Sequence, residues 1–143
     1  MRRMVEFSEA AIAFLAERRN ALLCIGRGEG RPPHATPVWF RFEHGVFGIS
    51  ITRTRVKYRL LRESPEVSLV IDDATGYRTV IVEGRAEITD DDGSLLALSR
   101  ALLAKYSERG ARGRDEDVLR RLHDEERVVV TVTPERVLAW LGD

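Results

Sequence analysis

The sequence predicts an α+β fold that is mainly β, an antiparallel barrel of about six or seven strands with short peripheral helices. Short segments rich in β-branched residues recur along the 143 residues, and hairpin turns connect most of them. Only one short helical segment interrupts the first run of hairpins, which favours a barrel over a doubly wound parallel sheet. The length fits a single domain that spans residues 1–143.

The individual elements follow from local periodicity and turn residues. Strands are predicted at residues 21–27, 34–43, 46–51, 67–72, 77–89, 127–133 and 137–141. Helices are predicted at residues 8–19, 55–64, 94–106 and 115–123. Ser8 is expected to cap the first helix, and Thr52 or Thr54 the second. Pro65 should end the second helix, because the residue before a proline avoids the helical region. Gly84 predicts a bulge or a barrel bend in the longest strand.

Composition argues against several classes of function. Positive and negative side chains balance, 23 against 23, so no overall field attracts nucleic acid. No apolar run approaches the roughly 20 residues of a membrane span, and the three histidines lack the spacing of metal ligands. The single cysteine, Cys24, is expected to be a buried apolar residue and cannot form an internal disulfide. We therefore expect a cytoplasmic protein without metal, membrane or nucleic-acid partners.

The most informative segment is a basic turn and helix that follow the third strand. Five positive charges and no negative ones lie within residues 53–62. Ser50 closes the strand, and Arg55 and Lys57 occupy the first helical turn. Cations oppose the helix dipole there, whereas free backbone N–H groups, a guanidinium and an ammonium together suit a bound phosphate. A phosphate site and a solvated basic helix face are both compatible with this pattern.

A second candidate region lies in the predicted second strand, where Pro37 stands close to two large aromatics, Trp39 and Phe40. A proline removes a ladder donor, so the strand is interrupted or lies at a sheet edge there. Backbone at an interruption can face a ligand instead of a neighbouring strand. The alternative is an edge-strand proline with Trp39 in the core.

The order of these motifs resembles the pyridoxamine 5'-phosphate oxidase-like split β-barrel family, and more narrowly its deazaflavin- and FMN-dependent oxidoreductases. The similarity spans nearly the whole chain. It is carried by residues 36–40, the strand ending at Ser50, the basic helix, the stop at residues 64–67 and the segment 82–88. The resemblance implies an FMN-binding split-barrel fold and a homodimer with a flavin-type cofactor in each of two grooves at the interface.

The resemblance also implies roles for individual residues. Ser50, Arg55 and Lys57 would hold the cofactor phosphate. Four consecutive residues would line the ring system, namely Thr36, Pro37, Val38 and Trp39. Tyr77 would approach the ring from a loop. No catalytic acid or base is assigned.

The expected function is hydride transfer between a bound coenzyme F-420 or FMN and a small organic substrate. Both cofactors present a ribityl phosphate, and the additional anionic tail of coenzyme F-420 would suit the exposed Arg53 and Arg59, which favours that cofactor. Two alternatives remain. One is an FMN-dependent enzyme like pyridoxamine-phosphate oxidase, and the other is a flavin-binding carrier or sensor without its own catalysis.

Overall fold

The computed structural model describes residues 5–142, so residues 1–4 and 143 of the predicted domain lie outside the described residues. Within that range the chain forms seven strands and four helices. The strands are β1 (Ala21–Ile25), β2 (His34–Val38), β3 (Arg41–Glu43), β4 (Val46–Thr52), β5 (Glu66–Asp72), β6 (Thr79–Thr89) and β7 (Arg127–Trp140). The helices are α1 (Glu9–Ala16), α2 (Val56–Glu63), α3 (Asp92–Tyr106) and α4 (Asp115–Asp124).

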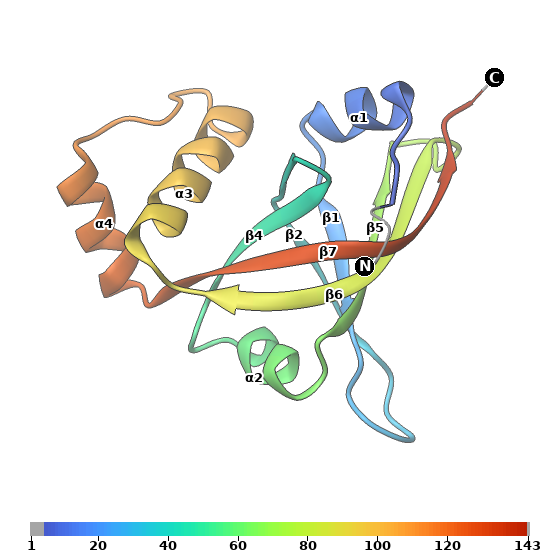
Figure 1. Cartoon of the computed structure of the whole chain (residues 1–143), viewed down its shortest axis with the longest axis horizontal. Helices are drawn as coiled ribbons and strands as arrows, with labels where there is room; N and C mark the ends of the chain where they lie inside the picture. Colours follow the sequence, from blue (N-terminus) through green and yellow to red (C-terminus); the bar gives the residue numbers. More distant parts are fainter. Residues whose placement is uncertain (1–4, 143) are drawn as a thin grey trace.

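All seven strands belong to one antiparallel sheet with the order β2-β1-β5-β6-β7-β4-β3. The long strands β6 and β7 run side by side along the sheet, and their curvature gives it the shape of a half-barrel (Figure 1). Helix α1 lies at one end of the strands and α2 at the opposite end, while α3 and α4 pack together at one side (Figure 1). The predicted split-barrel fold is confirmed.

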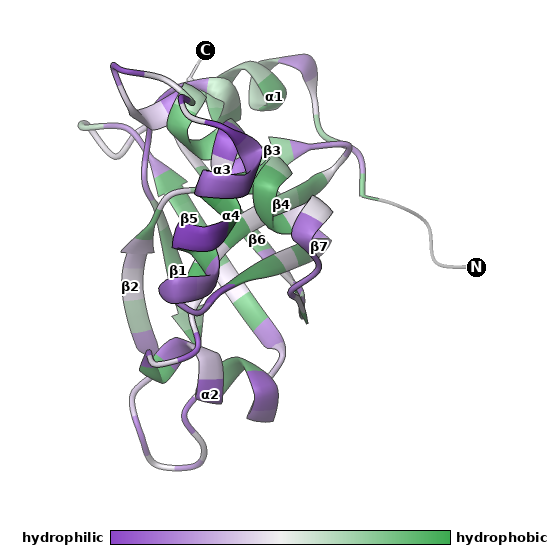
Figure 2. Ribbon diagram, turned by 90° about the vertical axis from the view of Figure 1, so that its left-hand side faces the viewer, coloured by the Kyte–Doolittle hydropathy of each residue, from purple (hydrophilic) through white to green (hydrophobic). Residues whose placement is uncertain are grey.

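The sheet encloses the main hydrophobic core, and a smaller cluster lies under the helix pair α3–α4. Phe14, Phe40 and Phe47 are fully buried in the main core. In β7, Val128 and Val130 face that core, whereas Val129 faces the second cluster beneath α3 and α4. Figure 2 shows that hydrophobic residues are concentrated along the central strands of the sheet. Residues 128–130 of β7 are therefore buried on both faces within a single chain.

The two edges of the sheet are connected by a short crossing. Strands β2 and β3 lie at opposite ends of the strand order, and the chain passes from one to the other through Trp39 and Phe40. The predicted strand 34–43 is therefore two strands, and the break follows Val38 rather than Pro37. Pro37 pairs with Leu22 in the edge strand β2, where its missing N–H costs little.

The last two predicted strands are one continuous strand, β7. Pro134 pairs with Gly84 at the point where the register of β6 and β7 shifts. The shift places one extra residue, Glu135, in β7 opposite Gly84, so the bulge predicted at Gly84 lies in the partner strand. A Cβ on that glycine would lie 2.5 Å from the Thr133 carbonyl oxygen. The bulge accommodates the proline, so the strand does not need to end there.

Cys24 is half-buried rather than part of the core. It alternates in β1 with Leu23 and Ile25, which are both fully buried, so its side chain faces outward. Burial still raises the pKa of its thiol. Among the described residues, no helix has the length and apolar composition needed to cross a bilayer.

Candidate functional site in the split of the half-barrel

The opening between the two sheet edges is bounded by Thr36 of β2, Ser50 of β4 and Lys57 of α2, and we call it the split. Only residues 46–48 of β4 pair with β3, so the rest of β4 has an open edge on that side. Helix α2 contacts both β1 and β4 and so closes one end of the opening. The Lys57 Nζ donates to Thr36 Oγ1 at 3.3 Å, which brings together two of the predicted site residues.

The start of α2 has no cap supplied by a side chain. Its N-cap residue is Arg55, which makes no capping hydrogen bond, and the first turn contains no acidic residue. The predicted caps are wrong, because the Oγ1 atoms of Thr52 and Thr54 lie 3.1 Å apart and bond to each other. The first backbone N–H groups of α2 are therefore left without a side-chain acceptor, as a bound anion would require.

A third cation, Arg127, was not identified from the sequence. It is the first residue of β7 and pairs with Thr52 in the register of β4 and β7. Burial lowers the pKa of Lys57, and the charges of Arg55 and Arg127 lower it further. Glu125 neutralises part of this charge through a 2.9 Å contact with the Arg127 Nε. The split therefore holds more positive than negative charge at the start of α2.

Trp39 and Ser50 line one pocket of about 240 Å³, together with Arg127 and residues of α3 and α4. The indole of Trp39 stacks on the Tyr106 ring with centroids 4.7 Å apart and planes inclined by 1°. Trp39 nevertheless remains 46% exposed. It is thus not a core residue, and the part of the indole outside the stack is available to a planar ligand.

Two consecutive side chains of α3 fix the crossing that carries Trp39. The Lys105 Nζ donates to the carbonyl oxygens of Leu15 and Phe40, at 2.8 Å and 3.1 Å. The Tyr106 hydroxyl accepts from the Phe40 N–H at 3.1 Å and donates to the Arg19 carbonyl at 2.6 Å. Phe40 lies outside the strand ladders, so these side chains satisfy its backbone polar groups. Neither residue was identified from the sequence.

The remaining predicted residues are more dispersed. Val38 is buried in the core, so only its backbone is at the split, whereas Pro37 is exposed on the sheet edge. Tyr77 is 83% exposed in the β5–β6 turn, at the opposite end of the strands from α2 (Figure 1). The next residue, Arg78, lies over the Phe14 ring of α1 at 4.9 Å. Within one chain Tyr77 is therefore remote from the split.

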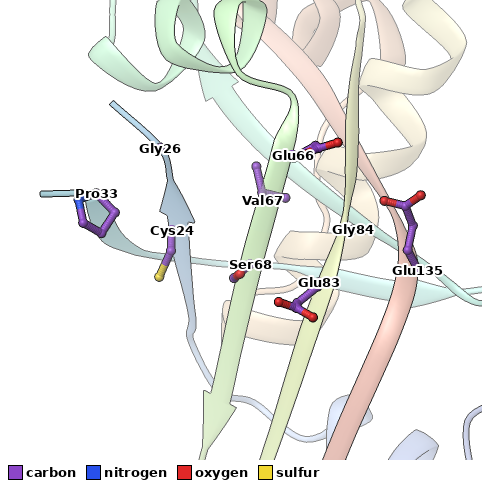
Figure 3. Close-up of a pocket in the computed structure, with 9 residues that line it drawn as sticks. All are labelled: Cys24, Gly26, Pro33, Glu66, Val67, Ser68, Glu83, Gly84 and Glu135. Atoms are coloured by element: carbon purple, nitrogen blue, oxygen red, sulfur yellow. The ribbon is translucent and has the colours of Figure 1, made fainter. Parts of the chain in front are cut away.

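A different pocket, of about 440 Å³, lies on the outward face of the sheet (Figure 3). Its lining includes the carboxylates of Glu66, Glu83 and Glu135 from three neighbouring strands, as well as Cys24 of β1. Three carboxylates repel a phosphate, so this pocket does not suit an anionic cofactor. The split, with its excess of cations, is the better candidate site.

The comparisons with known proteins concern the family and the fold. Residues 7–141 match the sequence profile described as pyridoxamine 5'-phosphate oxidase. Among solved structures, a conserved hypothetical protein from Mycobacterium tuberculosis is 27% identical, with a TM-score of 0.78 over 99% of this chain and 89% of that chain. An F-420 reductase is 24% identical, with a TM-score of 0.72 over 92% of this chain and 98% of that chain. An FAD-binding protein from Mesorhizobium loti is 20% identical, with a TM-score of 0.63 over 94% of both chains.

Proposed function

Because the chain belongs to the pyridoxamine 5'-phosphate oxidase family, we propose that it is an oxidoreductase that binds a flavin-type cofactor in the split. It would transfer a hydride between this cofactor and a small organic substrate. The observation that carries the proposal is the group of cations at the uncapped start of α2, where Arg55 and Arg127 both lower the pKa of Lys57. These cations repel one another and oppose the helix dipole, and a bound anion would relieve both costs.

The residues present fit a ribityl phosphate. Arg55 and Lys57 would donate charge-assisted hydrogen bonds, and the free N–H groups of α2 would add neutral ones. The Ser50 hydroxyl on the open edge of β4 can donate as well. Thr36, which contacts the Lys57 ammonium, would orient it. The predicted phosphate role of Ser50, Arg55 and Lys57 is the one we propose.

The ring system would lie against residues 36–39, with Trp39 beside it. A bound flavin or deazaflavin ring supplies the hydride donor or acceptor, so the protein needs to position it and exclude water. The stack of Trp39 on Tyr106 and the two hydrogen bonds of the Lys105 ammonium hold the wall of this pocket in place. We assign no catalytic acid or base.

We favour coenzyme F-420 as the cofactor, with FMN as the alternative. The F-420 reductase that shares this fold supports the choice, although the FAD-binding relative shows that the fold also accepts flavins. Fewer exposed arginines are available to an anionic tail than the sequence suggested. Arg53 already forms an ion pair with Asp90, which leaves Arg59 as the exposed arginine for such a tail.

A fluorescence titration with FMN and with coenzyme F-420 tests the proposal. Lys57→Ala and Arg55→Ala should each weaken binding by roughly 10- to 150-fold, because a charge-assisted bond contributes about 1.5 to 3 kcal/mol. Arg62→Ala, in the last turn of the same helix, is the matched control and should bind normally. Unchanged affinity in both test variants would contradict the phosphate site. A spectral change of the reduced cofactor on adding acceptors would separate an enzyme from a carrier or sensor.

We also propose the homodimer that the family resemblance implies, and we infer its interface from the exposed residues of the sheet. The segment at residues 127–132 is covered on both faces by its own chain, so it requires no partner. An apolar row instead crosses the outward face of five strands, formed by Pro37, Leu22, Val70, Ile81 and Leu138 in register. Leu22 and Leu138 are 38% and 39% exposed. Such a row is suited to a second copy of the chain.

Sedimentation should give twice the 16.2 kDa chain mass at micromolar concentration. Leu22→Glu should shift the protein towards a monomer, because it buries a charge in the interface. Ile12→Glu, at a comparably exposed position on α1, is the control and should remain dimeric. A monomeric wild-type protein would refute the dimer. In the dimer, Tyr77 would meet a cofactor only from the second copy, because it is remote from the split of its own chain.

A further inference from the structure

The helix pair α3–α4 carries a groove that extends beyond the proposed cofactor site. The pocket that contains Trp39 adjoins a second pocket of about 470 Å³, and both are lined by Leu103 of α3 and Arg121 of α4. The second pocket continues to the loop between the two helices, at residues 107–113. The groove therefore follows the seam between α3 and α4 from the split to this loop. From Ser99 to Ser107, the rise of a helix corresponds to about 12 Å.

The two ends of this groove differ in chemistry. Near the split, Trp39, Leu102 and Leu122 supply the apolar part of the lining, and the two arginines there, Arg121 and Arg127, share the carboxylate of Glu125. At the loop end, Arg109 and Arg112 both line the pocket. A ligand that fits both ends is elongated, with an apolar planar part at one end and an anionic group at the other.

The positive charge at the loop end is not neutralised locally. The one carboxylate in that lining, Asp117, bonds to Arg120 at 3.2 Å. The Arg112 Nε donates to the Arg109 carbonyl at 2.9 Å, which ties the loop together and leaves the other N–H groups of both guanidiniums. Among residues 5–142, neither arginine forms an ion pair with a carboxylate. Arg121 stands between the two ends, 3.9 Å from Glu125.

We propose that this groove binds the substrate of the hydride transfer, and that the substrate is an elongated planar molecule with a carboxylate or phosphate at its far end. Its apolar part would lie beside Trp39, next to the cofactor ring, and its anionic end would bind Arg109 and Arg112. The inference rests on the proposed function for its chemistry. Binding to the groove is nevertheless a property of the chain alone and can be measured without any cofactor.

The fluorescence of Trp39 reports on this groove directly. The chain has two tryptophans, so the full-length Trp140→Phe protein retains Trp39 as its single indole. The probes are 4'-nitrobiphenyl-4-carboxylate and its uncharged amide, and quenching is corrected for absorption by the probe. The carboxylate should bind roughly 10-fold more tightly than the amide, the value of one charge-assisted hydrogen bond. Equal affinities for the two probes would overturn the proposal.

Matched variants locate the anionic subsite. Arg109→Gln with Arg112→Gln should abolish the preference for the carboxylate and leave the affinity for the amide unchanged. The control, Arg31→Gln with Arg62→Gln, changes two exposed arginines outside the groove lining and should retain the preference. Circular dichroism melting verifies that both proteins are folded. A preference that persists in the test variant would overturn the assignment of Arg109 and Arg112.

A separate titration distinguishes the substrate from the tail of a cofactor. If the Arg109 and Arg112 variant loses affinity for coenzyme F-420 but not for FMN, the subsite belongs to the cofactor tail and the substrate proposal is wrong. Unchanged affinity for both cofactors, with a lost carboxylate preference, supports it. Failure of every variant to bind either cofactor would count against the proposed function, while the probe titration would still decide the groove.

Discussion

Helices α2 and α3 begin in opposite ways. The Asp91 carboxylate caps α3 by accepting from the Ser94 N–H at 3.0 Å, and Asp92 adds a negative charge to its first turn. The hydrogen bonds that Asp91 accepts from the backbone and side chain of Ser94 lower the pKa of its carboxyl group. Helix α2 has Arg55 at the N-cap, no capping bond, and Lys57 in its first turn. The start of α3 is therefore satisfied within the chain, whereas the start of α2 is arranged for an external anion.

The start of α2 is unfavourable for stability, and it is suited instead to binding a ligand. An unfavourable charge at a helix start costs about 0.3 to 1 kcal/mol, and a missing cap costs about 1 kcal/mol. Helix α2 tolerates both because Leu60 and Leu61 are buried in the main core. Packing rather than capping holds α2 in place, so its start is free to serve a ligand. An acidic cap introduced at the start of α2 should therefore raise stability and lower cofactor affinity, whereas loss of the cap of α3 should lower stability alone.

Arg55→Asp should have the largest effect, because it gives α2 the start that α3 has. We expect cofactor affinity to fall by more than about 100-fold, since a cation is lost and a charge that repels the phosphate is introduced. The free energy of unfolding should rise by about 1 kcal/mol, because aspartate caps the helix and favours its dipole. Urea unfolding and fluorescence titration measure the two quantities.

Asp91→Ala is the reciprocal control. It should destabilise the protein by about 1 kcal/mol through the loss of the α3 cap, with no change in cofactor affinity. If Arg55→Asp instead destabilised the protein, or if Asp91→Ala weakened cofactor binding, the division between the two helix starts would not hold.

At the C-terminal end of α3, the buried Lys105 should make the stability of the protein depend on pH. Burial lowers the pKa of Lys105 to about 8, against about 10.4 for an unfolded lysine. Between these values the unfolded chain binds more protons than the folded protein, so stability should rise with pH from about 8 to 10.4. The two carbonyl bonds of the ammonium and its place over the Phe40 ring oppose burial by favouring the proton. Allowing for this and for solvent screening, we expect a gain of about 1 to 2 kcal/mol.

Urea unfolding of the wild type and of Lys105→Met across this pH range isolates the effect, because other titrating groups cancel in the difference. The wild type should gain stability relative to the variant as the pH rises. A constant difference would mean that the carbonyl contacts, and not burial, determine the proton affinity of Lys105.

Local patterns predicted most of the fold and failed where distant segments meet. The predicted strand 34–43 breaks at Trp39 because the chain crosses there from one sheet edge to the other, which no local pattern records. Strand β7 continues through Pro134 because a bulge in β7 itself, opposite Gly84 of β6, accommodates the proline. Gly84 indicated the position of the bulge, because a glycine inside a long strand pattern is a local signal, but the extra residue lies in β7 and not in β6.

The residues of the candidate site also fall into two groups, those that local sequence reveals and those that only tertiary packing brings to the site. Lys57 and Arg55 were identified because their position at a helix start is visible in the sequence. Arg127 was missed because it joins them only through the pairing of β4 with β7. Tyr106 was missed because a tyrosine on the apolar face of a helix is usually a core residue, and its contact with the crossing depends on how α3 packs. A cation at the start of the predicted strand 127–133 was the one signal that pointed to Arg127.

Thr36→Val should have the smallest effect and tests how the open start of α2 is organised. Its hydroxyl accepts from the Lys57 Nζ at 3.3 Å, near the long limit for such a bond. Valine has the same shape without the acceptor, so we expect cofactor affinity to fall by only about 2- to 5-fold, with stability changed by less than about 0.5 kcal/mol. If Thr36 acts by orienting the ammonium, Thr36→Val should have no further effect in a Lys57→Ala background. Equal losses in both backgrounds would show instead that Thr36 contacts the ligand itself, and would place the edge of β2 in direct contact with the cofactor.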